Sequence, residues 1–371
     1  MRIGVNTRSI TGISGTGQDY YNAEILKRVV KNNTNHEFVF FAGKDCNSIF
    51  PSGKNVQIIE TGSIKENPFY WKLWFEVKLP YLLKKYKIDI LLSANGFCSM
   101  LTKVPQCLII HQLDFLHYPK NFNRINLLFL KINTKRSLKM AKTVITVSGF
   151  LKKEIKKNYQ LDAAKISVIH AAVADGFQPI EFSEKQTIKE KYTEAAEFFI
   201  YKGNLFPYQN MLNLLKAFSV FKKRQKSNMK LLIAGEIAKQ SKPLIEILKT
   251  YKFRNDIFLL DNNDNNEMVK IVAAAYAFVN PTINDGYHIH VIEAMACGVP
   301  VITLNADEID ADAALFASGE KVDEMAAQMM VIYKDENRRN ELIKKGLLLI
   351  KQFNWKKSAE LLWQSIEKTI A

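Results

Sequence analysis

The stretch NDGYHIHVIEAMACGVP, residues 284–300, brings together side chains that can do chemistry. Asp285, His288, His290 and Glu293 all fall within residues 285–293. Three kinds of site use such residues at such spacing. Histidines flanked by acids can bind zinc, a carboxylate and an imidazole can act as an acid/base pair, and a turn that opens a helix can bind an anionic or sugar ligand.

The local context favours the ligand-binding turn. Gly286 permits a tight turn, and the following residues predict a helix that begins near 288–291 and ends at Gly298, with Pro300 beyond it. The unpaired N–H groups of the first helical turn can bind phosphate or sugar oxygens. Glu293 lies further along the helix, where its carboxylate can accept two hydrogen bonds from a vicinal diol such as a ribose.

A metal site and a serine hydrolase are less favoured. Successive side chains of a turn diverge, and no other Cys or His of the sequence shows ligand spacing. No G-x-S-x-G motif occurs. We therefore expect neither a metal nor a cofactor.

Two other motifs follow apolar runs. Gly12, Gly15 and Gly17 lie in TRSITGISGTGQDYYNAEIL, between the first expected strand and the first expected helix. Such a loop lets a phosphate or sugar approach the backbone, although it lacks the third glycine of a dinucleotide fingerprint and a plain flexible loop remains open. His111 follows the strand-like CLII, which places it at a strand's carboxyl end. There it can hydrogen-bond a substrate hydroxyl or leaving oxygen, or serve a structural role.

The elements that position these motifs alternate between strands and helices. This alternation predicts parallel sheets covered by helices, and the pattern restarts after residue 195, beyond a polar stretch at 172–195. Expected strands are 1–6, 36–43, 56–60, 88–94, 107–112, 143–148, 197–203, 229–236, 256–261, 278–282 and 299–304. Expected helices are 17–32, 72–86 with a proline interruption, 209–224, 242–252, 266–277, 293–297 and 354–370, the last capped by Asn354. The fold class is therefore α/β, with two doubly wound Rossmann-like domains facing a central cleft.

Composition limits the class of protein and its partners. The 371 residues suit two domains, and the four cysteines are scattered, as in a reducing compartment. No signal peptide and no apolar run of membrane-spanning length is present, so we expect a cytoplasmic protein. The net charge is +15, and residues 115–160 carry many lysines and arginines against one acid, Glu154. This region predicts binding to an anionic membrane surface or a solvated helix face; no nucleic-acid reading motif accompanies the charge.

Taken in order, these motifs resemble the retaining glycosyltransferases of family four, which have the GT-B fold. Asp285 and Glu293, separated by seven residues and running into EAMACGVPVI, are similar to the family's signature. The segments GVNTRSITGISGTGQDYY, HQLDFLHYP, VITVSGFLKKEI, YKGNLFPYQNMLNLLKAF and FNWKKSAELL match the family's order and spacing. The resemblance covers nearly the whole chain.

The resemblance implies an enzyme that transfers a sugar from a nucleotide-sugar donor to a glycan or lipid-linked acceptor, with retention at the anomeric carbon. Residues 1–172 would form the acceptor-side domain, residues 173–353 would bind the nucleotide sugar, and the helix 354–371 would pack back on the first domain. Glu293 would hold the ribose hydroxyls and Asp285 would contact the donor sugar. The remaining implied site residues are His111 beside the transferred sugar, and Gly17, Lys202, Gly203, Gly286, Tyr287 and His288 around the donor.

The sequence also departs from the family. The family usually has glutamate at position 285, glycine at 288 and proline at 290. It carries basic residues that clamp the diphosphate where this chain has Tyr208 and Gln209. A leaving diphosphate is best stabilised by fixed cations, and Lys202 or a protonated His288 are the candidates to replace them. A member that binds nucleotide sugar with weakened catalysis is therefore the alternative, and a nucleic-acid binder a distant third.

Overall fold

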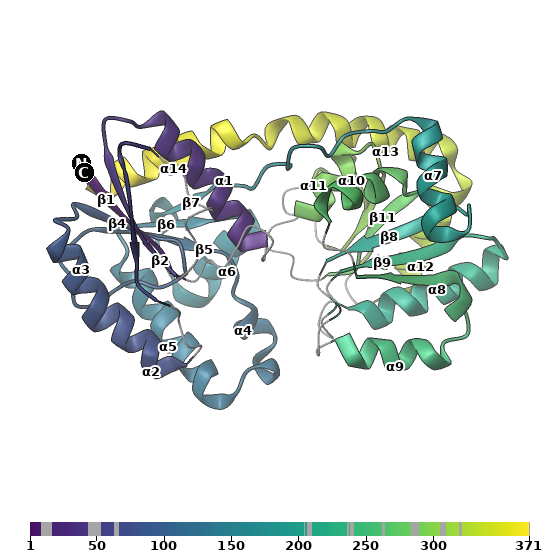
Figure 1. Cartoon of the computed structure of the whole chain (residues 1–371). Coiled ribbons are helices and arrows are strands. Elements are labelled where there is room, and N and C mark those ends of the chain that lie inside the picture. The colour runs from purple at the N-terminus through teal and green to yellow at the C-terminus, as the bar shows by residue number, and fades with distance from the viewer. Residues whose placement is uncertain are drawn as a thin grey trace. The chain divides into compact units, whose positions relative to one another are not determined.

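The computed structural model describes residues 1–8, 17–43, 53–62, 67–203, 205, 210–235, 237, 241–261, 264–282, 289–304, 309–318 and 321–370. The chain divides into two compact units (Figure 1). Unit 1 comprises Met1–Ala171 with Asn354–Ala371, and unit 2 comprises Ala172–Phe353. The first domain expected from the sequence ends at residue 172, one residue after the end of this first segment.

Unit 1 is built on a seven-stranded parallel sheet with the order β3-β2-β1-β4-β5-β6-β7. The strand order reverses between β1 and β4, and ligands of open parallel sheets bind beyond the carboxyl ends of strands at such a switch point. The strands are β1 (Arg2–Thr7), β2 (Glu37–Ala42), β3 (Val56–Glu60), β4 (Ile90–Ser93), β5 (Gln106–Ile110), β6 (Thr143–Thr146) and β7 (Ile166–Val168).

Helices cover this sheet, and the C-terminal helix is one of them. In α14, Ser358 Oγ donates to the His170 carbonyl at 2.8 Å and Thr369 Oγ1 to Thr143 Oγ1 at 2.9 Å. Asn354 caps α14 by accepting from the Lys356 N–H at 2.7 Å. The helices of unit 1 are α1 (Gly17–Asn32), α2 (Pro68–Leu73), the π-helical turn η1 (Trp74–Lys78), α3 (Leu79–Lys85), α4 (Asp114–His117), α5 (Arg124–Met140), α6 (Gly149–Tyr159) and α14 (Trp355–Ile370).

The helix expected at 72–86 differs from the structure in its start and in its continuity. It begins at Pro68, because Asn67 caps it by accepting from the Phe69 N–H at 2.9 Å and proline suits a first helical position. The proline at 80 does not interrupt it. The Leu79 N–H donates to the Trp74 carbonyl in an i→i+5 bond, which makes residues 74–78 a π-helical turn. This turn leads directly into α3, so Pro80 falls in the first turn of α3 and the helical segment continues through it.

Unit 2 is built on a six-stranded parallel sheet with the order β10-β9-β8-β11-β12-β13. Its strands are β8 (Phe198–Lys202), β9 (Lys230–Ala234), β10 (Ile257–Leu260), β11 (Ala277–Asn280), β12 (Val301–Thr303) and β13 (Leu315–Phe316). Its helices are α7 (Phe182–Thr193), α8 (Met211–Gln225), α9 (Lys242–Thr250), α10 (Asn265–Ala274), α11 (Ile289–Ala296), α12 (Val322–Lys334) and α13 (Glu336–Leu349). The two parallel-sheet α/β domains predicted from the sequence are confirmed.

The core of unit 2 has two layers because successive strand residues point to opposite faces of the sheet. Phe199 packs in the cluster that contains Phe218 of α8, and its neighbour Phe198 packs in the cluster that contains Ile271 of α10. The stretch 172–195, expected to be a polar connection, instead contains α7, whose Ile188 is buried in the second cluster. The hydrophobic periodicity of α7 is weak, so the sequence pattern does not predict this helix.

Candidate functional site

A lysine, a histidine and a glutamate meet at the carboxyl end of β8. We call Lys202, His290 and Glu293 the strand-end cluster. Lys202 Nζ lies 2.7 Å from Glu293 Oε2, and His290 Nδ1 lies 2.9 Å from the same oxygen. Lys202 is the last residue of β8, and the other two residues occupy one face of α11 at i,i+3 spacing. The cluster therefore lies at the edge of the sheet where ligands of parallel α/β domains bind.

The fold around Glu293 holds its carboxylate rigidly. Every residue from Val291 to Ala296 of α11 is buried, and the Glu293 side chain is only 6% exposed. Burial by itself raises the pKa of this carboxyl, but the charge of Lys202 and the hydrogen bond from His290 outweigh that effect and lower the pKa to about 2. Glu293 is therefore a fixed anion at neutral pH. Both of these contacts fall on Oε2, so Oε1 lies outside them.

The backbone beside this cluster approaches another strand end closely. The Gly203 N–H donates to the Ala234 carbonyl at 3.0 Å, and a Cβ on Gly235 would lie 2.0 Å from the Gly203 oxygen. Gly203 has φ of 152°, which favours glycine. A Cβ on Gly203 would lie 3.7 Å from His290 Cδ2. The two glycines thus bring β8 and β9 together next to the cluster, and Lys202, Gly203 and Glu293 from the sequence prediction are brought together here.

His111 occupies a different place, in unit 1. It follows β5, its Nε2 lies 3.1 Å from the Ala94 carbonyl, and its ring packs edge-on against Tyr21 at 5.6 Å between centroids. Burial lowers the pKa of His111 to about 3, although the bond to Ala94 opposes that shift. The imidazole is therefore neutral near pH 7, where it can exchange hydrogen bonds but is not a charged group.

The His111 ring lines a cavity of about 170 Å³. Asn95 also lines this cavity, and neither polar atom of its buried side chain has a hydrogen-bond partner among the described residues. Gln18 of α1 is a third polar group on the wall. Gly17, the residue before it, begins α1, and no described atom lies within 4 Å of the position that a Cβ would take there. His111 and the start of α1 are thus neighbours around one cavity, with polar atoms available to a ligand.

Several predicted site residues cannot be placed. Asp285, Gly286, Tyr287 and His288 lie outside the described residues, as do Tyr208 and Gln209. Within the described ranges, no group of three or more His, Cys, Asp or Glu side chains gathers as a metal site would require. That finding does not cover 283–288, so the expectation of no metal stays a prediction.

Sequence reasoning missed two contributors. In the sequence His290 stands out only as half of an H-x-H pair, whereas the structure shows it bonded to Glu293; the i,i+3 spacing on a helix is the signal for this contact. Asn95 belongs to no motif of the sequence. Its signal is its position two residues beyond the apolar strand ILLS, at the carboxyl ends of the strands.

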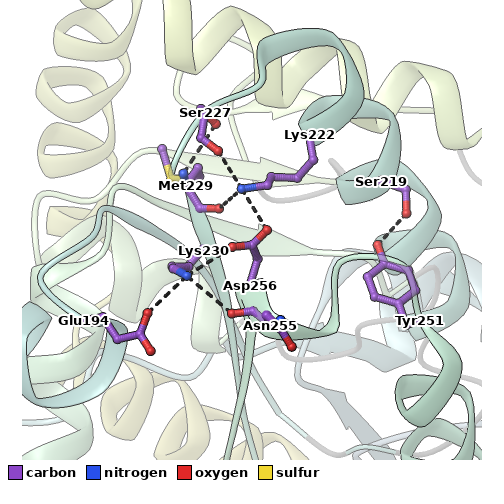
Figure 2. A network of polar contacts seen from close by, with 9 residues as sticks. All are labelled: Glu194, Ser219, Lys222, Ser227, Met229, Lys230, Tyr251, Asn255 and Asp256. Carbon is purple, nitrogen blue, oxygen red and sulfur yellow. Dashed lines mark hydrogen bonds and ion pairs between the residues drawn. The ribbon is translucent and has the colours of Figure 1, made fainter.

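Two buried lysines lie at the opposite, amino-terminal ends of the unit 2 strands. Figure 2 shows this group, which we call the amino-edge network: Lys222, Lys230 and Asp256 with Glu194, Ser227, Met229 and Asn255. Lys222 Nζ lies 3.0 Å from Asp256 Oδ2, and Lys230 Nζ lies 3.1 Å from Asp256 Oδ1. Lys230 is the first residue of β9, and Asp256 precedes β10. The network therefore lies away from the ligand-binding edge.

Two family models match successive parts of the chain. Residues 15–175 match the model described as Glycosyltransferase Family 4, and residues 182–349 match the model described as Glycosyl transferases group 1. The chain belongs to the family 4 glycosyltransferases. This membership confirms the family resemblance found in the sequence.

Curated relatives of this glycosyltransferase include two O-antigen enzymes. O-antigen chain mannosyltransferase B of Escherichia coli is 23% identical over 354 residues, which cover 92% of this chain and 93% of that protein. O-antigen chain mannosyltransferase RfbU of Salmonella typhimurium is 29% identical over 197 residues, which cover 53% of this chain and 51% of that protein. Both are named for the transfer of mannose.

Solved structures share the fold of this glycosyltransferase. Sucrose-phosphate synthase from Thermosynechococcus elongatus superimposes with a TM-score of 0.78 at 16% identity, covering 98% of this chain and 97% of that one. Anabaena HepE, solved in complex with UDP and glucose, gives 0.75 at 13% identity, with 99% of each chain covered. At these identities the likeness concerns the fold alone.

Proposed function

We propose that this protein is a retaining glycosyltransferase that moves a hexose, most simply mannose, from a nucleotide sugar to a glycan or lipid-linked acceptor during the synthesis of a surface polysaccharide. The names of the O-antigen relatives support the sugar and the pathway class. A lipid-linked acceptor places the reaction at the inner face of the membrane, and the basic residues 115–160 favour an anionic surface.

The observation that carries the proposal is the geometry of Glu293. Lys202 and His290 hold its Oε2 and keep the carboxylate ionised, so the group is oriented before a ligand arrives. An ionised carboxylate accepts two hydrogen bonds from adjacent hydroxyls at the strand end where nucleotides bind in such folds. The ribose of the donor supplies those hydroxyls.

Lys202 supplies positive charge for the diphosphate. The ammonium lies 4.8 Å from the centroid of the Phe177 ring and 2.7 Å from Glu293, and its side chain is 17% exposed. A preorganised, partly buried cation stabilises charge that develops on a leaving phosphate better than a solvated one does. Gly203, with no side chain, lets the diphosphate approach the backbone next to Lys202. Asp285, Gly286, Tyr287 and His288 complete the donor site in this proposal, and no metal takes part.

In the proposed reaction the bond between the anomeric carbon and the diphosphate oxygen breaks. The acceptor hydroxyl attacks the same face of the sugar, and its proton passes to the departing phosphate oxygen. The products are the glycosylated acceptor and a nucleoside diphosphate. His111, neutral and hydrogen-bonded, orients a sugar hydroxyl from the cavity of unit 1 rather than carrying charge.

A thermal-shift screen against UDP, GDP, TDP and their sugars tests donor binding, since a ligand that binds the native state raises the unfolding midpoint. A transfer assay with the donor that binds then compares the wild type with Glu293→Ala. The proposal expects loss of transfer in this variant. Unchanged transfer in Glu293→Ala, or no binding across the whole panel, would contradict it.

A second candidate is a member that binds the donor but turns it over weakly. The sequence favours it at one place, where Tyr208 and Gln209 stand instead of the family's basic clamp. The variant Tyr208→Arg with Gln209→Lys decides between the two. A large gain in turnover at unchanged donor affinity supports the binding-only candidate, whereas efficient turnover by the wild type excludes it.

A further inference from the structure

The helix pair α2–α3 exposes a continuous apolar stripe. Phe69, Leu73, Val77 and Tyr81 follow one another every four residues and are 69, 47, 58 and 63% exposed. The π-helical turn η1 lies between α2 and α3, so the stripe runs along one unbroken helical segment. Side chains at such spacing lie on the same face of a helix. This face is turned away from the core, because the buried residues of the segment are others: Trp74, Phe75, Leu79, Leu82 and Leu83.

A second exposed stripe runs along α5. Ile125, Leu128 and Ile132 are 74, 60 and 46% exposed, at i,i+3,i+7 spacing. The buried residues of α5 are Thr134, Ser137 and Leu138, nearer its C-terminal end. The N-terminal half of α5 thus presents a row of apolar side chains to solvent. Singly exposed apolar residues are common on protein surfaces, but a row of them indicates an interaction site.

The two stripes belong to neighbouring helices. α2 contacts α5, and Figure 1 shows the two helices side by side. Trp71 stacks on Phe75 at 5.7 Å, and Phe97 bridges from Trp71 at 5.4 Å to Phe129 of α5 at 5.9 Å. These rings line a hollow of about 250 Å³, with Leu101, 68% exposed, and the side chains of Lys72 and Arg136 on its wall. The two stripes and the hollow thus lie on contacting helices, and we call them together the apolar face.

The helices that carry the apolar face are strongly basic. The segment α2–α3 has one acid, Glu76, whose carboxylate accepts from the Met100 N–H at 3.2 Å, and α5 has none. The basic residues of these helices are Lys72, Lys78, Lys84, Lys85, Arg124, Lys131, Lys135, Arg136 and Lys139. Apolar side chains rimmed by lysine and arginine are the pattern of a helix that lies in the interface of an anionic bilayer.

We propose that the apolar face docks unit 1 on an anionic phospholipid bilayer, with Phe69, Val77, Tyr81, Ile125 and Leu128 entering the headgroup–acyl boundary. This inference rests on the proposed function only in that a lipid-linked acceptor would be met there. The proposed contact with the membrane is thus a defined surface and not the whole basic region 115–160, and it includes α2–α3, which lies outside that region.

A second copy of the chain fits this surface less well. In a symmetric dimer the same face would meet itself, so the lysines and arginines of these helices would oppose an identical set with few acids to pair. A bilayer containing anionic headgroups offers the opposite charge and an apolar interior at once. Charge complementarity therefore selects the membrane.

The test is sedimentation of the full chain with vesicles of phosphatidylglycerol mixed with phosphatidylethanolamine, compared with phosphatidylcholine vesicles. We expect binding to the anionic vesicles that weakens as salt is raised. The variant Phe69→Ser/Val77→Ser/Tyr81→Ser should weaken that binding about a hundredfold, since three interfacial anchors are lost. The variant Lys131→Gln/Lys135→Gln should weaken it about thirtyfold on anionic vesicles and have little effect on neutral ones.

The matched control is Phe182→Ser/Leu348→Ser in unit 2. These side chains are 71 and 63% exposed, so the control removes two large exposed apolar side chains outside the apolar face, and it should bind vesicles as the wild type does. Equal weakening by this control, or no preference of the wild type for anionic vesicles, overturns the proposal. So does a dimer in solution that the α2–α3 variant converts to monomer. Donor affinity, measured in the same proteins, separates the claims: vesicle binding without donor binding overturns the proposed function alone.

Discussion

Two clusters of charged side chains in unit 2 each pair lysine with a carboxylate, and they differ in the hydrogen-bond capacity that they leave for a ligand. In the amino-edge network, Lys222 Nζ contacts the Ser227 and Met229 carbonyls at 2.6 and 3.1 Å as well as Asp256. Both oxygens of Asp256 carry a lysine. In the strand-end cluster, Lys202 Nζ contacts a single oxygen of the described residues, Glu293 Oε2.

The difference is one of saturation. An ammonium has three donors, and Lys222 places all three on protein oxygens, as does Lys230 through Glu194, Asn255 and Asp256. Such a network has no donor left for a ligand and serves the fold. Within the described ranges, in contrast, Lys202 keeps donor capacity and Glu293 keeps Oε1, at the strand ends where ligands bind. Charge and burial alone do not distinguish a structural network from a binding site, whereas the remaining hydrogen-bond capacity does.

The largest expected effect comes from breaking the amino-edge network. Asp256→Ala leaves two buried ammonium groups without their shared carboxylate, so we expect the free energy of unfolding to fall by about 3–5 kcal/mol. Urea denaturation measures this loss. The exposed pair Lys249–Glu246 provides the control, since Glu246→Ala should cost about 1 kcal/mol or less. If Asp256→Ala leaves the free energy of unfolding unchanged, the amino-edge network does not stabilise the fold as described.

An acid titration sharpens the comparison at the other cluster. The pKa of Glu293 falls from 4.5 to about 2 on folding, so its contribution to stability is full above pH 4.5 and is lost as the pH falls toward 2. Between pH 5 and pH 3 the wild type should lose about 2 kcal/mol more than Glu293→Gln, which has no such proton to bind. Unfolding midpoints at the two pH values measure the difference, and parallel curves for the two proteins would argue against a lowered pKa.

Removing the cation of the strand-end cluster should weaken donor binding. Lys202→Gln keeps a hydrogen-bond donor but loses the charge proposed to face the diphosphate, so we expect nucleoside diphosphate affinity to fall about tenfold, or about 1.4 kcal/mol. The amino-edge variant Lys222→Gln should leave the affinity of the folded protein unchanged. Calorimetric titration of both variants measures this, and equal losses would mean that the two lysine groups do not differ as described.

The smallest expected effect concerns His290. His290→Ala removes one of the two groups that hold Glu293 Oε2 while Lys202 remains, so we expect donor affinity to fall only about threefold, or about 0.7 kcal/mol. His290→Asn should restore part of the loss, because an amide can donate to the same oxygen. If His290→Asn loses as much donor affinity as His290→Ala, His290 contacts the ligand itself and does not act by holding Glu293.

The sequence predicted elements better than contacts. The helix expected at 17–32 has those bounds in the structure, and the helix expected to begin near 288–291 begins at Ile289, because apolar periodicity and glycine stops are local signals. Lys202 and Glu293 were each proposed for the donor site, but their ion pair joins residues 91 positions apart, which no local pattern encodes. No local pattern links Lys222, Lys230 and Asp256 either, since Asp256 lies 26 positions from Lys230. The π-helical turn escaped detection because a proline at 80 predicts a break, not a re-registered helix.

The most direct test of the donor site is a thermodynamic cycle that combines a change at Glu293 with removal of the 2′-hydroxyl of the ribose. Wild type, Glu293→Gln and the amino-edge control Lys222→Gln are each titrated with the ribonucleoside diphosphate that binds and with its 2′-deoxy form. If Glu293 accepts hydrogen bonds from the ribose diol, the deoxy form should bind the wild type and the control about tenfold more weakly, or about 1.4 kcal/mol, and Glu293→Gln should scarcely discriminate between them. An unchanged preference for the ribonucleotide in Glu293→Gln would contradict the account.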